Sequence, residues 1–315
     1  MSELDKESLD KCRKLLDPAG EFKLNVYRGD TLAVEFSHYD VILGNPPYNC
    51  GSQTLYHRFI EKFIDKCRYL LFITCTPSRW FSGGKGLGAF RKMMLARTDI
   101  RLIKHFDNAS EIFKGVNING GVSYFLRDSS YSGKCKFNGA MTDLSRYDVV
   151  VEPKWNSLIE KFKDEPKLSD LYFGRCYGIE TNDKRLLDKP VAGAILCYVN
   201  QKMGFRKWIK GAQPDGCWKV ITARAIGSAP RFGNTFIGKP NEVHCGSYLS
   251  FRVNSQAQAE SLLSFMKCKL TYMMLATRKS SQNLCKDTIA WVPPPPLNRV
   301  WTDGEVAKYY RLRRR

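Results

Sequence analysis

The sequence lacks the roughly 18–20 consecutive apolar residues that a membrane-spanning helix requires, which argues against an integral membrane protein. Its longest apolar run, residues 69–75, has the length of one buried strand. No C-x-x-C pair occurs among the eleven cysteines, so we expect no zinc or other metal site. The polar, acidic start has no features of a secretory signal. We therefore expect free thiols and a cytoplasmic protein.

Acidic residues are also scarce, because 31 Asp and Glu stand against 50 Lys and Arg and leave a formal net charge of +19. A surplus of this size repels itself and usually serves a polyanionic partner. Nucleic acid is the commonest such partner, an anionic membrane surface is the rival, and a basic protein without any polyanion remains an alternative. The length of 315 residues and the hydrophobic content of 43% suit two domains with real cores.

Strand-like and helical segments alternate through the first part of the chain. This alternation predicts an α/β fold, with a mainly parallel sheet and helices on its faces. The expected strands are residues 39–43, 69–74 and 100–106, and the expected helices are residues 55–68 and 87–96.

The alternation of expected strands and helices ends after residue 112. Residues 122–126 and 135–137 follow one another as strands without a helix between them, which predicts an antiparallel hairpin at the end of the sheet. From about residue 150 onward, short strands and loops dominate, with one long helix over 257–274. We therefore expect a catalytic domain over 1–150 and a mixed α+β domain over 151–315 that ends in a basic tail.

Asn45-Pro46-Pro47-Tyr48 directly follows the expected strand 39–43. Ligands of open parallel sheets bind beyond the carboxyl ends of the strands, so this tetrapeptide should lie beside a cleft. The side-chain oxygen of Asn45 and the carbonyl of Pro46 are two acceptors that suit an amino group, and Tyr48 offers a flat face to a base. Two such acceptors stabilise positive charge that grows on an adenine amine during attack. The alternative is an ordinary turn, because Asn-Pro commonly opens one.

This tetrapeptide after an apolar strand resembles the signature of adenine-N6 DNA methyltransferases, in particular the gamma (TaqI-like) restriction–modification type. The resemblance implies a Rossmann-like methyltransferase sheet, a target-recognition domain, S-adenosylmethionine as methyl donor and double-stranded DNA as substrate. Because a base amine is out of reach inside the duplex, it also implies base flipping. The residues it implicates are Asn45, Pro46, Pro47 and Tyr48 in catalysis, Tyr48 and Phe113 in stacking on the target base, and Asp30 and Pro47 in cofactor binding. Core packing of Phe113 and a turn or capping role of Asp30 remain open.

Two segments interleave basic with aromatic or glycine residues. The glycine-rich stretch 82–88 lacks the Gly-Lys-Ser/Thr ending of a nucleotide P-loop, but its backbone amides could hold DNA phosphate. A second segment, residues 202–208, belongs to the expected recognition domain. Phosphate or guanine contacts are typical of such side chains, although a solvated basic surface is the plainer interpretation. The candidates are Arg79, Trp80, Lys85, Lys202, Arg206, Lys207, Arg278 and Lys279.

Gamma-type enzymes normally begin with a strand that ends in a glycine-rich loop, followed by an acidic residue that holds the cofactor ribose. Neither feature occurs in the 29 residues before Asp30. We therefore expect a Rossmann-like sheet and an S-adenosylmethionine pocket that are both incomplete in this chain. The missing strands would leave apolar edges exposed, which favours a partner.

The leading hypothesis is an adenine-N6 DNA methyltransferase of a restriction–modification system. A second polypeptide could supply the cofactor half, and a nuclease could be fused or separate. The alternatives are an inactive fragment and a non-catalytic DNA-binding or specificity subunit. Methylation of RNA or of a protein glutamine is a further alternative. The large basic second domain argues against a protein substrate.

Overall fold

The computed structural model describes residues 2–3, 6–21, 23, 25, 27–51, 53–75, 86–118, 121–227, 229–279 and 283–312. The chain divides into two compact units, Met1–Asp148 and Val149–Arg315. Among the described residues, no helix combines the length and the apolar character that crossing a bilayer demands. The functional labels given to the two halves of the chain stay predictions.

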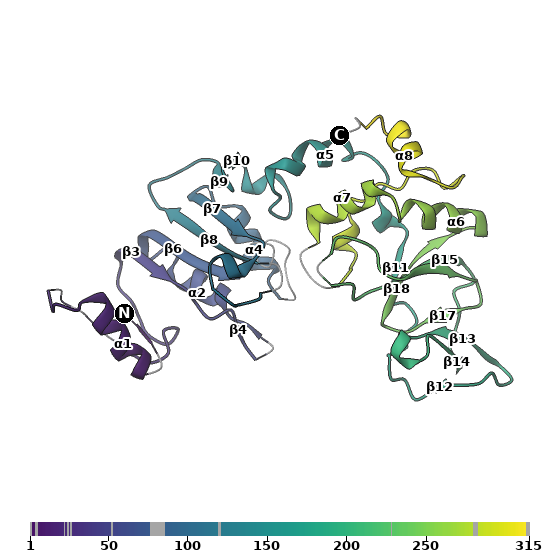
Figure 1. The fold of residues 1–315 in the computed structure, drawn as a ribbon, viewed down its shortest axis with the longest axis horizontal. Coiled ribbons are helices and arrows are strands. Elements are labelled where there is room, and N and C mark those ends of the chain that lie inside the picture. Colours follow the sequence, from purple (N-terminus) through teal and green to yellow (C-terminus); the bar gives the residue numbers. More distant parts are fainter. Residues whose placement is uncertain are drawn as a thin grey trace. The chain divides into compact units, whose positions relative to one another are not determined.

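A six-stranded sheet with the order β10-β9-β7-β8-β6-β3 forms the centre of the first unit (Figure 1). Strands β3, β6, β7 and β9 run in one direction, whereas β8 and β10 run in the other. The predicted mixed α/β fold with a mainly parallel sheet is therefore confirmed. The strands are β3 (Tyr39–Gly44), β6 (Cys67–Cys75), β7 (Ile100–Phe106), β8 (Val122–Asp128), β9 (Cys135–Phe137) and β10 (Ala140–Thr142).

An antiparallel hairpin does lie at one end of this sheet, but it is formed by β9 and β10. Asn138 and Gly139 close it with φ values of 44° and 91°, as an Asn-Gly turn of the type I′ class requires. The expected succession of residues 122–126 and 135–137 as hairpin partners is wrong. β8 pairs with β6 on one side and with β7 on the other. Most of its side chains are buried, which favours a central position over an edge.

Helices α2 (Tyr56–Phe63) and α4 (Gly88–Leu95) bury their apolar sides in the first unit. The fully buried residues Tyr56 and Ile60 come from α2, and Met94 comes from α4. The Phe63 ring of α2 meets the Phe72 ring of β6 with a centroid distance of 6.2 Å. The other elements are β1 (Ser2–Glu3), α1 (Lys6–Leu16), β2 (Tyr27–Arg28), β4 (Asn49–Cys50), β5 (Gln53–Thr54), η1 (Ala109–Glu111) and η2 (Leu144–Arg146).

The second unit contains two four-stranded sheets with the orders β11-β18-β15-β16 and β12-β14-β13-β17. The strands are β11 (Tyr172–Gly174), β12 (Leu186–Leu187), β13 (Ala194–Tyr198), β14 (Arg206–Lys210), β15 (Trp218–Ala223), β16 (Thr235–Gly238), β17 (Val243–His244) and β18 (Tyr248–Val253). The helices are η3 (Pro153–Trp155), α5 (Asn156–Lys161), η4 (Leu168–Asp170), η5 (Gln201–Met203), α6 (Gln256–Phe265), α7 (Lys269–Arg278), η6 (Asp287–Ile289) and α8 (Asp303–Tyr309). This mixture agrees with the expected α+β composition of the region.

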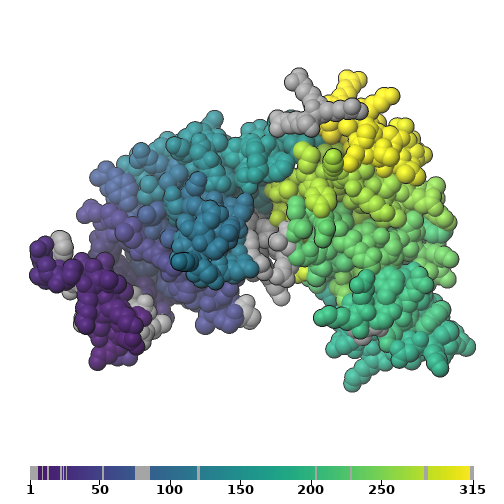
Figure 2. Space-filling view, viewed as in Figure 1, coloured from purple at the N-terminus to yellow at the C-terminus, as the bar shows by residue number. Residues whose placement is uncertain are grey.

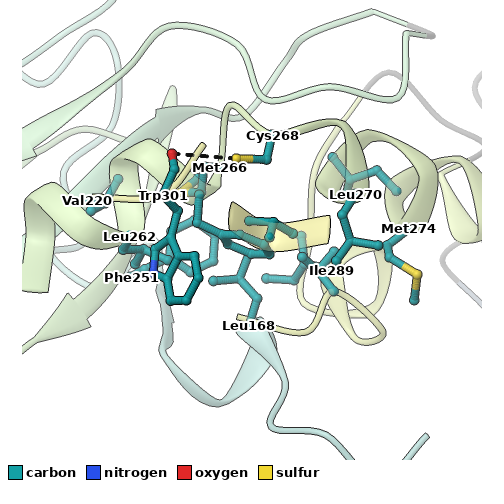
Figure 3. Close-up of a cluster of buried hydrophobic side chains, with 14 of the residues drawn as sticks. Leu168, Val220, Phe251, Leu262, Met266, Cys268, Leu270, Met274, Ile289 and Trp301 are labelled. Carbon is teal, nitrogen blue, oxygen red and sulfur yellow. Dashed lines mark hydrogen bonds between the residues drawn. The ribbon is translucent and has the colours of Figure 1, made fainter. Parts of the chain in front are cut away.

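The single helix expected over 257–274 is wrong, because the chain is extended at Cys268, between α6 and α7. Contacts from a distant part of the chain hold the break open. Asp303 accepts a hydrogen bond from the amide of Lys269 at 2.6 Å, and the Cys268 thiol donates to the carbonyl of Trp301 at 3.8 Å (Figure 3). The break lets both helices contribute to one core, in which Leu262 and Leu270 are almost fully buried.

Candidate functional site

The tetrapeptide Asn45-Pro46-Pro47-Tyr48 follows the last residue of β3, at the edge where that strand ends. Asn45 and Pro47 are exposed, Pro46 is buried and Tyr48 is partly buried. The two prolines end the strand, since proline has no N–H to give to a sheet ladder. Asn45 therefore presents its side chain to solvent, while its neighbour Pro46 anchors the backbone.

Gly44 allows the strand to end close against β6. It pairs with Phe72, and a Cβ atom at Gly44 would lie 2.7 Å from a carbon of the Phe72 ring. Because Gly44 has no side chain, the Phe72 ring can pack directly against its backbone.

Replacing Gly44 by alanine should lower the free energy of unfolding of the first unit by about 1–3 kcal/mol, because the new methyl group overpacks the contact with Phe72. Denaturant unfolding followed by circular dichroism measures the loss. Gly88→Ala is the matched control, since nothing lies within 4 Å of a Cβ placed there. Equal stabilities of the wild type and the Gly44→Ala variant would contradict the proposed role of this glycine.

A short hairpin follows the tetrapeptide and brings the chain back to Tyr48. β4 pairs with β5, and the carbonyl of Tyr48 accepts a hydrogen bond from the amide of Leu55 at 2.9 Å. Tyr56, the next residue and the first of α2, is fully buried. The backbone of Tyr48 is thus fixed next to a buried helix start.

The carboxyl ends of β3, β6 and β7 meet at the same edge of the sheet. Gly44 pairs with Phe72, three residues before the end of β6, and Val122 at the start of β8 pairs with both Cys75 and Phe106. Two strand spacings separate β3 from β8, and Gly44 lies three residues short of the level of Val122, so the end of β3 and the start of β8 are about 14 Å apart. The connection between β7 and β8 therefore lies on the same side of the sheet as Asn45.

Phe113 belongs to this connection and is partly buried. Its amide donates to the carbonyl of Ala109 at 2.8 Å, which ties it to the short helix η1. The connection then closes at Gly121, whose φ is +77° and where a Cβ would lie 2.0 Å from the carbonyl oxygen of Phe106. The fold brings Phe113 to the same edge as Tyr48, and the stacking of both rings on one base stays a prediction.

Asp30 lies in an exposed turn of the first unit. Its Oδ1 atom accepts a hydrogen bond from the amide of Leu32 at 2.9 Å, and its carbonyl accepts one from Ala33 at 3.0 Å. The turn role that the sequence left open for Asp30 is therefore present, and its contact with a cofactor stays a prediction. The described residues contribute no glycine-rich turn beside it, so they do not by themselves fit S-adenosylmethionine.

The DNA-contacting candidates have different surroundings. Arg79, Trp80 and Lys85 lie outside the described residues. Lys202 and Arg206 are exposed.

Three other candidates for DNA contact form interactions within the protein itself. Lys207 forms an ion pair with Asp188. Arg278 and Lys279 are both buried: the former donates to the carbonyl of Asp287 at 2.7 Å, and the latter to the carbonyl of Gly227. The interpretation of Arg278 and Lys279 as surface contacts for DNA is corrected accordingly, since their charged ends satisfy main-chain carbonyls of the second unit.

Sequence reasoning did not identify a buried ion cluster in the second unit. Lys219 of β15 is fully buried, and its Nζ atom lies 2.7 Å from Oδ1 of Asp215 and 3.0 Å from the carbonyl oxygens of Lys239 and Glu242. Arg252 completes the cluster with a 3.0 Å contact to Asp215. Burial alone would raise the pKa of Asp215, but the two cations hold it below its ordinary value. The only signal in the sequence is a lysine within an apolar strand.

His244 is buried in β17, a strand of the other four-stranded sheet of this unit. One ring nitrogen lies 3.1 Å from the carbonyl of Cys245 and the other 3.0 Å from the Ser250 hydroxyl. Burial lowers the pKa of His244 to about 4, because the charged form loses its hydration. The unfolded chain therefore takes up a proton below about pH 6.5, while the folded chain resists it until about pH 4.

Stability of the second unit should thus be complete above pH 6.5 and fall by about 2 kcal/mol between pH 7 and pH 5. Tryptophan fluorescence during urea unfolding measures this, since five of the six tryptophans follow residue 149. The variant His244→Gln removes the only histidine of that unit and should lose the pH dependence in this range. A wild-type protein that is equally stable at both pH values contradicts the assignment.

A mixed α/β sheet with Asn-Pro-Pro-Tyr at the tip of one of its strands resembles the amino-directed methyltransferases, and the chain is similar to known proteins of that class. Residues 1–113 match the family model described as Eco57I restriction-modification methylase. A relative from Mycoplasma pneumoniae, described as an uncharacterized adenine-specific methylase, is 30% identical over 132 residues, which are 38% of this chain and 31% of that protein. The resemblance to restriction–modification methyltransferases that the motif predicted is therefore confirmed.

The solved structure of one restriction–modification enzyme shares this fold. The type IIL enzyme MmeI in complex with DNA aligns with a TM-score of 0.50 at 12% identity, over 91% of this chain and 51% of that one. The type IIG restriction endonuclease BpuSI aligns over 92% of this chain and 51% of that one, with a TM-score of 0.31 and 12% identity. This chain thus spans about a third of the length of the Mycoplasma relative and about half of each enzyme.

Proposed function

We propose that this chain forms part of an enzyme that methylates the N6 amine of adenine in double-stranded DNA, within a restriction–modification system of the cytoplasm. The observation that carries the proposal is the exposed Asn45 between the tightly packed end of β3 and the buried Pro46. The match of residues 1–113 to a restriction–modification methylase family supports the same chemistry.

In this proposal the chain's own residues hold the target base. The side-chain oxygen of Asn45 and the carbonyl of Pro46 accept the two hydrogens of the amine and stabilise its growing positive charge. Tyr48 and Phe113, which come to the same edge of the sheet, stack on the two faces of the extruded base. Stacking offsets part of the cost of removing the base from the duplex, at roughly 1–3 kcal/mol per base.

Methyltransferases of this kind take their methyl group from S-adenosylmethionine, and Asp30 and Pro47 are the residues of this chain proposed to contact it. The residues proposed here account for the amine side of the reaction, and the described residues form no full cofactor pocket. We propose that a further segment or a second polypeptide supplies the rest of that pocket.

We propose that this further segment or second polypeptide joins the sheet at the free edge of β3. β3 pairs only with β6 among the described strands. Its side chains Tyr39, Val41 and Leu43 are 43%, 51% and 69% exposed, which is unusual for apolar residues of a strand next to a functional motif. A strand that pairs with this edge would cover these side chains and border Asn45.

The second unit is proposed to read double-stranded DNA. The formal charge of +19 on the whole chain supports a polyanionic partner. The exposed Lys202 and Arg206 remain candidates for contacts with phosphates, whereas Arg278 and Lys279 do not.

The experiment is transfer of labelled methyl groups from S-adenosylmethionine to duplex DNA, with mass spectrometry of the digested nucleosides. The expected product is N6-methyladenine. Transfer of the labelled methyl group to protein or RNA, with none transferred to DNA, would overturn the proposed substrate.

The rival from another class is a non-catalytic DNA-binding or specificity subunit. It predicts DNA binding without methyl transfer and without binding of labelled S-adenosylmethionine, also when the remaining polypeptides of the system are added. A titration with the labelled cofactor therefore separates the two functions.

A further inference from the structure

The second unit contains an open hollow of about 310 Å³ that belongs to neither the tetrapeptide nor the predicted DNA contacts. It lies between α5 and α8, which Figure 1 shows close together. The yellow C-terminal segment that borders it lies at the surface in Figure 2. This volume is at the lower end of sites that hold small molecules. The lining residues are Lys161, Phe162, Glu165, Tyr309, Tyr310 and Arg311.

One wall of this hollow is a rigid aromatic group. Tyr310 is buried, donates its hydroxyl to the carbonyl of Pro293 at 3.1 Å and meets Phe162 edge to face at 4.9 Å. Tyr309 contacts the rings of Tyr310 at 4.8 Å and Trp301 at 5.5 Å, yet 45% of it stays exposed. Tyr309 is thus held from two sides and presents the remaining surface to a ligand.

The polar lining carries charge of both signs. Lys161, the last residue of α5, and Arg311, two residues beyond the end of α8, are exposed, and Glu165 is partly buried. Two cations suit a phosphate, and the carboxylate suits a ligand that also offers N–H or O–H donors. A flat group with such donors would complete the match by stacking on Tyr309.

We propose that this hollow binds one nucleotide, with its phosphate on Lys161 and Arg311, its base on Tyr309 and a donor of the base or sugar on Glu165. The shared chemistry is a nucleotide phosphate, which either a strand of DNA or a free nucleotide supplies. The proposal stands on the lining residues alone and does not rest on the proposed methyl transfer.

The test is binding of dAMP and, in a second arm, of a mixed-sequence duplex oligonucleotide, both followed by tryptophan fluorescence and calorimetry. The double variant Lys161→Gln/Arg311→Asn removes both cations, and asparagine tolerates the positive φ of 49° at position 311. Affinity should fall at least tenfold. Tyr309→Leu, which keeps apolar bulk and removes the stacking face, should cost about tenfold.

Lys163→Gln is the matched control, because Lys163 is exposed two residues beyond Lys161 and does not line the hollow. Losses in the dAMP arm assign a free nucleotide, and losses confined to the duplex arm assign a DNA strand. Unchanged affinity in the hollow variants, or an equal loss in Lys163→Gln, overturns the proposal. Thermal melting confirms that each variant is folded, and methyl transfer is not needed for any readout.

Discussion

Replacing Asn45 by alanine is expected to lower the rate of adenine methylation by about 100–1,000-fold, the usual loss when one preorganised group that stabilises a charged transition state is removed. Affinity for DNA should change little, because contacts with phosphates dominate binding to nucleic acid. The measurement is the single-turnover rate with saturating duplex DNA and S-adenosylmethionine, alongside a binding titration.

Two comparisons make this prediction specific to the amine. Asn45→Asp keeps an oxygen acceptor at the same position and should retain more activity than Asn45→Ala. Tyr48→Phe keeps the ring and should resemble the wild type, whereas Tyr48→Ala should lose activity with the stacking face. Full activity of Asn45→Ala would remove the assigned role from this residue and, with it, the main support for the proposed reaction.

Replacing Lys219 by alanine is expected to lower the free energy of unfolding of the second unit by about 3–5 kcal/mol, because it leaves Asp215 buried with one of its two cations missing. The cost falls on β15, which pairs with both β16 and β18 and so lies inside its sheet. Urea unfolding followed by tryptophan fluorescence measures it.

The variant Lys219→Met separates the lost charge from the lost volume, since methionine fills much of the same space without a positive charge. It should still be strongly destabilised. Lys210→Ala, at an exposed position of β14, is the surface control and should stay within about 0.5 kcal/mol of the wild type. A small effect of both Lys219 variants would show that the buried pair contributes little.

The predictions for the two units can be tested separately, because a negative result for one unit leaves the other prediction unaffected. The effect of Asn45 concerns chemistry at the edge of the first sheet, and the effect of Lys219 concerns stability of the second unit. A protein that loses activity through Asn45→Ala while keeping its unfolding curve would show that the tetrapeptide acts in catalysis and not in folding.

The periodicity of the sequence located β3, β6 and β7 closely, because each is an apolar run bounded by turn residues or by a helix of clear spacing. It also placed Asn45 at a strand tip, since the two prolines cannot continue a ladder. These features are local, and the order of residues along the chain is sufficient to specify them.

The tertiary structure decided what local patterns cannot encode. The insertion of β8 between β6 and β7 depends on burial from both sides, and the break at Cys268 depends on Asp303 and Trp301, more than thirty residues away. The burial of Arg278 and Lys279 likewise cannot be predicted from the sequence, because the residue type is the same whether the charge faces solvent, DNA or a carbonyl inside the fold. The sequence by itself therefore determined the position of the tetrapeptide at the end of a strand, and only packing decided which charged residues elsewhere are available to a ligand.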